Sequence, residues 1–262
     1  VINHSMLVFV GLGLNDERDL TLKGLEEARS CDLLFAEFYT SALSITSEEI
    51  ARLVGKEIIV LDRSEIEEKE DMILEPATKK KVCLLVPGDP LISTTHISLR
   101  IEAKKRGIET RVVHNASISS AAPSVSGLQN YKFGKSASIA MPEKGFSPET
   151  PYDVVKENKA RGLHTLLFLD IKVDGEKRRL LTAGQAMKIL LDTEAKRGEG
   201  VFTAETLCIV LGKVGSENCV VKAGNVKDLL TQTFGAPPHT LIVPGRLHFM
   251  EEEYLREFGG LK

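Results

Sequence analysis

The stretch 81–96, KVCLLVPGDPLISTTH, limits the possible folds of this chain more than any other part of the sequence. Residues 82–86 form a continuous apolar run, which is typical of a strand buried on both faces of a parallel sheet. The run ends at Pro87-Gly88-Asp89-Pro90. A polar cluster that ends at His96 follows, and the residues after it are spaced as in a helix. Open α/β sheets bind ligands at the carboxyl ends of such strands, so Asp89 is a candidate binding carboxylate. The same turn is also explained by a tight connection in which Asp89 caps the next helix.

Composition excludes several classes of function. The 262 residues contain 34 Lys and Arg against 37 Asp and Glu, a net charge of -3, so no basic face for nucleic acid is expected. No apolar run approaches the ~18 residues of a membrane span. Residues 1–5, VINHS, have no charged leader region, and we interpret them as an expression scar.

The cysteines indicate a reducing, cytoplasmic environment. All four stand far apart without a CxxC pair, so neither a disulfide framework nor a zinc site is expected. Cys83 and Cys208 lie within apolar runs, where a free cysteine behaves as a small hydrophobic residue. We expect no metal.

Strand and helix patterns alternate through the first half of the chain. Strands are expected at 6–10, 32–38, 57–61, 82–86 and 109–113. Helical segments separate them, and capping boxes are expected at Thr46 with Glu49 and at Ser64 with Glu67. This order predicts an α/β domain over 6–130, with a mostly parallel sheet and helices on both faces.

A local rise in glycine and proline content predicts the domain boundary. Five glycines and prolines fall within 131–151, which we interpret as a linker region. Residues 152–262 predict a mixed α/β domain whose short connections allow antiparallel pairing. Its strands are expected near 164–172, 206–211, 219–223 and 240–243, and its longest helices at 182–196 and 247–258.

A glycine pair near the N-terminus resembles a dinucleotide-binding fingerprint. Gly11 and Gly13 follow the first strand, and Glu37 ends the next one. Asp16, however, occupies the third glycine position, where it would face the pyrophosphate. A nicotinamide-dependent oxidoreductase is therefore a weak alternative, and a neutral or cationic ligand suits Asp16 and Asp89 better.

Other polar residues at strand ends allow two interpretations each. The segment 114–118, HNASI, follows a strand with small side chains that expose backbone to a ligand, but Asn115 or Ser117 could equally cap a helix. His164 and His239 stand beside apolar strands, where a single histidine is more often structural than catalytic. Neither a Ser-His-Asp catalytic triad nor a P-loop with its phosphate-binding lysine can be assembled from these residues.

Taken together, the motifs resemble one family along nearly the whole chain from Met6. They are GLGLNDERDLTLKGLE, EFYTS, PGDPLISTTH, HNASI, GLQNYKFG, YDVVKEN and GLHTLLFLDIK, in this order. They are similar to the diphthine synthase family of the tetrapyrrole-methylase-like methyltransferases. The resemblance implies a two-domain α/β fold with S-adenosylmethionine bound in the cleft between the halves, usually in a homodimer.

The resemblance also implies which residues contact the cofactor. Matched motif by motif, they are Leu14, Asp89, Ile92, Ser117, Ile118, Leu169, Gly212 and His239. The implied reaction is trimethylation of the amino group on a 3-amino-3-carboxypropyl histidine of elongation factor 2, which gives diphthine and S-adenosylhomocysteine.

The catalytic group is not fixed by this resemblance. Because the attacking amine must be neutral, a proton acceptor near it is expected, and Glu37, Tyr39 and Asp89 are candidates. The main alternative is a methyltransferase of the same fold acting on a corrin or porphyrin precursor. A non-catalytic cofactor-binding protein is a further alternative, because a fold alone does not guarantee a reaction.

Overall fold

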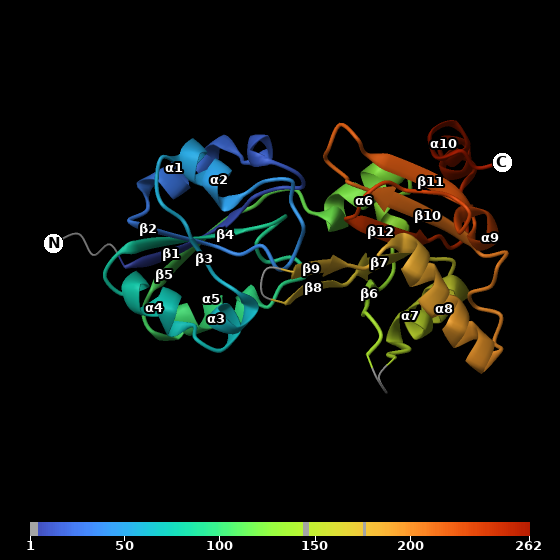
Figure 1. Ribbon diagram of the computed structural model, residues 1–262, viewed down its shortest axis with the longest axis horizontal. Coiled ribbons are helices and arrows are strands. Elements are labelled where there is room, and N and C mark those ends of the chain that lie inside the picture. The colour runs from blue at the N-terminus through green and yellow to red at the C-terminus, as the bar shows by residue number, and fades with distance from the viewer. Residues whose placement is uncertain (1–4, 144–146, 175–176) are drawn as a thin grey trace. The chain divides into compact units, whose positions relative to one another are not determined.

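The computed structural model describes residues 5–143, 147–174 and 177–262, so most of the expected expression scar lies outside the described residues. The chain forms two compact units, Val1–Ile118 and Ser119–Lys262 (Figure 1). Each unit is built on its own five-stranded sheet.

The first unit contains a wholly parallel sheet, as the alternating pattern predicted. Its strands occur in the order β3-β2-β4-β1-β5. Their bounds are β1 Met6–Gly11, β2 Leu33–Ala36, β3 Ile59–Val60, β4 Lys81–Val86 and β5 Glu109–Val113. The helices are α1 Leu22–Ser30, α2 Ser47–Val54, α3 Arg63–Glu67, α4 Asp71–Ala77 and α5 His96–Lys105.

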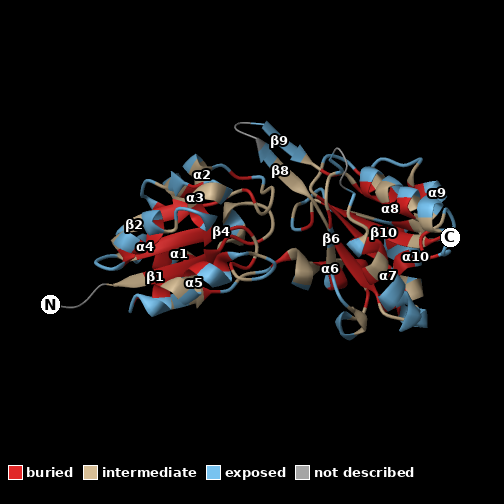
Figure 2. Cartoon of the chain, turned by 90° about the horizontal axis from the view of Figure 1, so that it is seen from below, coloured by how far each residue is buried: buried red, intermediate tan, exposed pale blue. Residues whose placement is uncertain are grey.

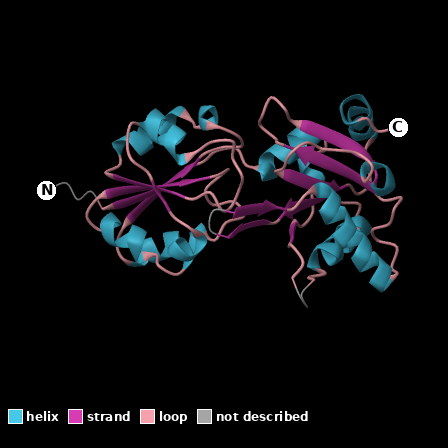
Figure 3. Cartoon of the chain, in the orientation of Figure 1, coloured by secondary structure: helices cyan, strands magenta, loops and turns pink. Residues whose placement is uncertain are grey.

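Helices cover both faces of this sheet because its central strands are apolar on both sides (Figures 1 and 3). Leu84 of β4 packs in a cluster with α3, α4 and α5, whereas Cys83 and Leu85 pack in the opposite cluster with α1 and α2. Alternate side chains of a strand point to opposite faces, so a continuous apolar run fills two cores. The prediction made from residues 82–86 is confirmed.

One local prediction for this unit differs from the structure. The capping box before α3 uses Asp62 with Glu65, not Ser64 with Glu67. The helix expected after His96 occurs as α5, and its Ile97 and Ile101 are exposed, at 51% and 52%.

The second unit is mixed, as expected. Its sheet has the order β11-β10-β12-β7-β6, antiparallel except where β6 joins β7. The strands are β6 Ala137–Ile139, β7 Thr165–Leu169, β10 Leu207–Gly212, β11 Val220–Asn225 and β12 His239–Val243. A separate hairpin pairs β8 Ile171–Asp174 with β9 Lys177–Leu180. The helices are α6 Ile118–Ser126, α7 Thr150–Ala160, α8 Ala183–Arg197, α9 Val226–Leu229 and α10 Phe249–Gly259. Buried residues concentrate on the strands of both sheets (Figure 2).

The division between the units falls before the expected end of the N-terminal domain. The segment after α6 is tied to the second unit, because Glu251 of α10 accepts a hydrogen bond from the Gln129 amide at 2.8 Å. The segment 131–151 is also more than a linker, because it contributes β6 to the second sheet.

All four cysteines are free thiols; Cys31, Cys83 and Cys208 are buried and Cys219 is exposed. Across the described ranges, no helix is long and apolar enough to cross a membrane. The same residues contain no group of three or more side chains suited to holding a metal ion.

Candidate active site

Three loops meet at the carboxyl edge of the first sheet. They follow β1, β4 and β5, which are neighbours in the order β4-β1-β5. The Gly88 amide donates to the Gly13 carbonyl at 2.8 Å, and the Gly13 amide donates to the Gly88 carbonyl at 3.3 Å. Residues 11–13 are therefore joined through the backbone to the loop after β4. We refer to the three loops after β1, β4 and β5 together as the wall.

Because glycine has no side chain, it allows the backbones of this wall to lie in close contact. A Cβ placed on Gly11 would lie 2.5 Å from the Gly88 carbonyl oxygen and 2.8 Å from Asn115 Cβ. The side-chain amide of Asn115 donates to the carbonyls of Gly11 and Asp19, each at 2.9 Å. The loop after β5 is thereby hydrogen-bonded to the loop after β1.

This arrangement lacks the features of a dinucleotide fingerprint. The α-helix after β1 begins only at Leu22, where the Thr21 hydroxyl accepts from the Gly24 amide, and the short 3-10 helix before it, Glu17–Asp19, is capped by the Asp16 side chain. Asp16 is bound to Arg18, whose guanidinium lowers the pKa of that carboxyl. No helix N-terminus of this loop is left for a pyrophosphate.

Asp89 lies at the centre of the wall. It is 7% exposed, and its Oδ1 accepts from the Leu91 amide at 3.2 Å. Its Oδ2 accepts from the His114 ring Nδ1 at 2.8 Å and from the Asn115 amide at 3.3 Å. The Asp89 carboxylate therefore links the loop after β4 to the loop after β5.

The other cofactor residues expected in this unit border the same loops. Leu14 donates its amide to Asp19 Oδ2 at 3.1 Å, and a Cβ on Gly88 would lie 3.5 Å from Ser117 Cβ. Ile118 follows Ser117 directly as the first residue of α6. Ile92 is 47% exposed.

Backbone strain occurs directly after two of the predicted cofactor positions. Among the described residues other than glycine, only Ser93 (φ 57°) and Lys213 (φ 47°) have positive φ. Ser93 follows Ile92 and Lys213 follows Gly212, so each strained residue adjoins an expected cofactor contact. Strain of this kind costs on the order of 1–3 kcal/mol and clusters at functional sites.

The three cofactor residues expected in the second unit also lie together. Gly212 of β10 pairs with His239 of β12 across the antiparallel ladder. Thr240 pairs with Phe168 of β7, which brings Leu169 level with His239 one residue further along. Leu169, Gly212 and His239 therefore form a row across three neighbouring strands.

Both ring nitrogens of His239 are engaged by the protein. Nδ1 accepts from the Ala183 amide at the start of α8 at 3.2 Å, and Nε2 lies 3.2 Å from the Gly235 carbonyl, to which it donates. Burial lowers the pKa of His239, and hydrogen bonds from its ring to backbone carbonyls oppose this only in part. Burial therefore favours the neutral form of the ring.

Glu37 and Tyr39 belong to a buried cluster that follows β2. Glu37 is fully buried; its Oε1 accepts from Thr40 Oγ1 at 2.5 Å and lies 3.2 Å from His96 Nε2. Its Oε2 accepts from the Tyr39 and Thr40 amides at 2.9 and 3.1 Å. Burial, followed by the charges of Glu37 and Glu67, raises the pKa of Tyr39. Glu37 thus orders the loop after β2, and both side chains are shielded from solvent.

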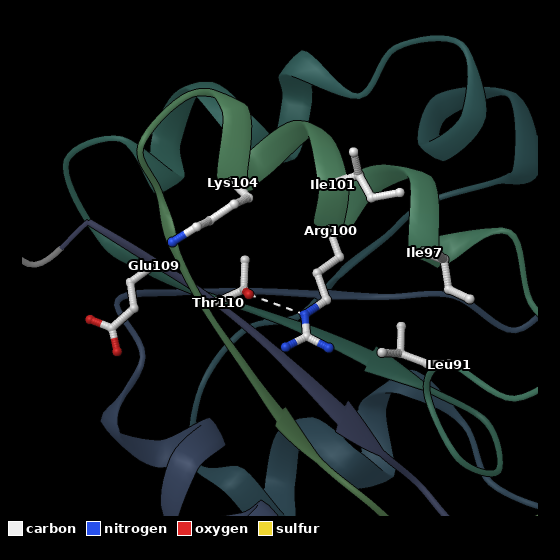
Figure 4. Close-up of a pocket in the computed structure, with 7 residues that line it drawn as sticks. All are labelled: Leu91, Ile97, Arg100, Ile101, Lys104, Glu109 and Thr110. Atoms are coloured by element: carbon white, nitrogen blue, oxygen red, sulfur yellow. Dashed lines mark hydrogen bonds between the residues drawn. The ribbon is translucent and has the colours of Figure 1, made fainter.

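A groove of about 630 Å³ lies elsewhere on the first unit, between α5 and the edge strand β5 (Figure 4). Arg100 Nε donates to Thr110 Oγ1 at 3.1 Å across it. The lining residues are Leu91, Ile97, Arg100, Ile101, Lys104, Glu109 and Thr110, and none is an expected cofactor contact.

Sequence reasoning missed two members of this wall. His114 and Asn115 were noted only for the segment that carries them, yet their side chains bind Asp89, Gly11 and Asp19. The signal available in the sequence was their position directly after the strand that ends at Val113.

Comparison with known proteins identifies the family of this chain. Residues 6–229 match the sequence model of the tetrapyrrole (corrin/porphyrin) methylases. The diphthine synthase of Methanocaldococcus jannaschii is 46% identical over 252 residues, which cover 96% of this chain and 98% of that protein. The diphthine synthase of Methanosarcina mazei is 49% identical over 256 residues, which cover 95% and 94% of the two chains.

A solved structure gives the same result for the fold. The crystal structure of a diphthine synthase superposes with a TM-score of 0.89 at 40% sequence identity, covering 98% of this chain and 97% of the other. The resemblance inferred from the sequence motifs is confirmed. The chain belongs to the tetrapyrrole (corrin/porphyrin) methylase family, and it is a methyltransferase.

Proposed function

We propose that this protein uses S-adenosylmethionine to trimethylate the amino group of the 3-amino-3-carboxypropyl histidine in elongation factor 2, which gives diphthine. The observation that carries this proposal is the full-length likeness to diphthine synthases, with 46–49% identity over at least 94% of both chains. The five expected cofactor residues of the first unit and the three of the second, each gathered within its own unit, support it.

The residues of the first unit suit a cationic and partly apolar cofactor. We propose that Asp89 binds a polar group of S-adenosylmethionine, with Leu14 and the backbone of Ser117 and Ile118 beside it. The exposed Ile92 side chain offers apolar surface for the adenine. We propose that the row of Leu169, Gly212 and His239 supplies backbone contacts from the second unit.

The cofactor supplies an activated methyl group, so the protein mainly has to hold and orient the reactants. The amine of the acceptor must lose a proton before its lone pair can form the new bond. Glu37 and Tyr39 are buried, which favours a role in ordering the loop after β2 over direct contact with the amine. Any part that they take in catalysis stays a prediction.

Partners and location follow from the same proposal. Elongation factor 2 is the protein substrate, the enzyme is a homodimer, and it works in the cytoplasm. Four free cysteines agree with a reducing compartment. The balanced charge agrees with a protein substrate rather than direct binding to nucleic acid.

Intact-mass analysis of elongation factor 2 tests the reaction. After incubation with the enzyme and S-adenosylmethionine, factor that carries the unmethylated precursor should gain the mass of three methyl groups. Factor whose modified histidine is replaced by another residue should gain none. An unchanged mass of the precursor form would refute the proposed substrate.

The second candidate is methylation of a corrin or porphyrin precursor, because the family takes its name from such enzymes. The transfer of labelled methyl groups to a tetrapyrrole, and none to elongation factor 2, would establish it instead.

Calorimetry with S-adenosylmethionine tests the cofactor site separately. Asp89→Ala should weaken binding by about tenfold or more, because a buried carboxylate that bonds a ligand contributes at least ~1.5 kcal/mol. Glu75→Ala is a matched control, because Glu75 is an exposed carboxylate of α4. Equal affinities of the wild-type and Asp89→Ala proteins would remove Asp89 from the cofactor site.

A further inference from the structure

We infer that His114, oriented by Asp89, is the general base that removes the proton from the acceptor amine. This inference rests on the proposed function and adds a catalytic residue to it. It comes from the geometry at the ends of β4 and β5, where a buried carboxylate holds an exposed imidazole.

The hydrogen bond to Asp89 fixes which nitrogen of His114 is available. Nδ1 lies 2.8 Å from Asp89 Oδ2, and a carboxylate only accepts, so Nδ1 carries the proton. The lone pair of the neutral ring is then on Nε2. The side chain is 75% exposed, so an incoming substrate can reach this ring.

Exposure is what separates His114 from the other candidates. Its side chain is 75% exposed, whereas that of Asp89 is 9% exposed. The acceptor amine stands on a residue of another protein and must arrive from solvent, so its base must be reachable from outside. Glu37 and His96, whose side chains are 0% exposed, are not reachable.

The neighbouring carboxylates are already committed to other donors. Asp16 binds Arg18 at 2.7 Å. Asp19 Oδ2 accepts from the Leu14 and Asn15 amides at 3.1 and 2.7 Å. His114 also lies three residues before Ser117, beside the expected cofactor contacts of the first unit.

The step balances in atoms and charge. Before each transfer, one proton passes from the substrate ammonium to His114 Nε2, and from there to solvent. The amine lone pair then forms the N–C bond as the methyl–sulfur bond of the donor breaks, which leaves a neutral thioether. Three rounds release three protons and yield a quaternary ammonium, which has no proton left to lose.

His114→Asn isolates this role. The Asn side-chain nitrogen can take the place of Nδ1 as the donor to Asp89, but the variant has no second nitrogen to accept a proton. Single-turnover methylation of elongation factor 2 at saturating S-adenosylmethionine should slow by about 10²–10⁴-fold, the usual contribution of a general base. The dissociation constant for S-adenosylmethionine, from calorimetry, should stay within about twofold of wild type. His248→Asn, which changes an exposed histidine that caps α10, should leave the rate unchanged.

Chemical rescue distinguishes a base from a positioning residue. In His114→Ala, added imidazole should restore the rate by about tenfold or more, because it supplies the missing acceptor. Absence of rescue, or a His114→Asn rate within about threefold of wild type, would overturn the assignment. Cofactor binding lost in proportion to the rate would also overturn it. If the wild-type enzyme itself fails to methylate elongation factor 2, the proposed function fails instead.

Discussion

At the scale of single residues, the candidate site depends on close contact between backbones. Gly11 leaves no room for a side chain, because a Cβ there would lie 2.5 Å from the Gly88 carbonyl oxygen. Neither atom can rotate away, because the carbonyl oxygen belongs to the backbone and the position of a Cβ is fixed by the backbone. The loops after β1 and β4 can therefore meet only if residue 11 is glycine.

Gly11→Ala should lower the free energy of unfolding by about 1–3 kcal/mol, the usual cost of overpacking, and should weaken cofactor binding. Urea denaturation followed by circular dichroism measures the first effect and calorimetry the second. Gly184→Ala is the matched control: nothing lies within 4 Å of a Cβ in that first turn of α8. Alanine there should leave stability unchanged or raise it by up to about 1 kcal/mol. Equal effects of the two changes would contradict this account.

Sequence reasoning found Asp89 but not its partner. A carboxylate between Gly88 and Pro90 after a buried strand stands out in the sequence. His114 is 25 residues away, and its role follows from a contact that only the pairing of β4 and β5 with β1 creates. Side-chain contacts between loops of different strands cannot be deduced from either stretch alone.

At the scale of elements, one buried acid links α10 to the segments that precede β6 and β7. Glu251 accepts from the Gln129 and His248 amides at 2.8 and 2.7 Å, and it pairs with Lys132 and His164. Burial alone would raise the pKa of Glu251, but these four donors outweigh it and lower the pKa to about 2. The carboxylate thus stays charged and anchors the helix over a wide pH range.

His164 makes this anchor sensitive to acid. Nδ1 accepts from the Gly245 amide at 3.0 Å, so the neutral ring donates through Nε2 to Glu251 at 3.1 Å. Burial lowers the pKa of His164, and Glu251 opposes this only in part. The unfolded chain therefore binds a proton that the folded chain does not, and stability is lost as the pH falls below the ordinary value of 6.5.

As the pH falls below 6.5, the free energy of unfolding should fall by up to about 1.4 kcal/mol per pH unit for this one proton. His164→Gln should be less stable at neutral pH but should show a shallower decline, because glutamine does not titrate. Urea denaturation at several pH values measures both. His248→Asn, which retains a capping residue at α10, should keep the slope of the wild type. A His164→Gln slope equal to that of the wild type would refute the assignment.

Elements with strong local signals were predicted well. The capping box of Thr46 with Glu49 and the strand that ends at Val113 occur as expected. The box at Ser64 was misplaced because Asp62 and Glu65 offer the same spacing two residues earlier. The short strand β6 was missed because three residues carry no readable periodicity.

At the scale of the whole molecule, the sequence predicted two α/β units and the kind of sheet in each. Alternating strands and helices indicated the parallel sheet, and short connections indicated antiparallel pairing in the second. The border between the units could not be located in the same way. It falls at Ile118–Ser119, at the start of α6, where composition does not change.

The distribution of thiols gives each unit a built-in reporter. Cys219 is exposed, whereas Cys83 and Cys208 are buried in the first and second sheets. Burial raises the pKa of Cys208, which keeps it unreactive while the sheet is intact. A brief pulse of maleimide will thus modify Cys219 in the native protein, and later labelling of Cys83 or Cys208 will time the opening of one unit or the other. Peptide mapping of the adducts can follow the two halves of this enzyme separately without any engineered probe.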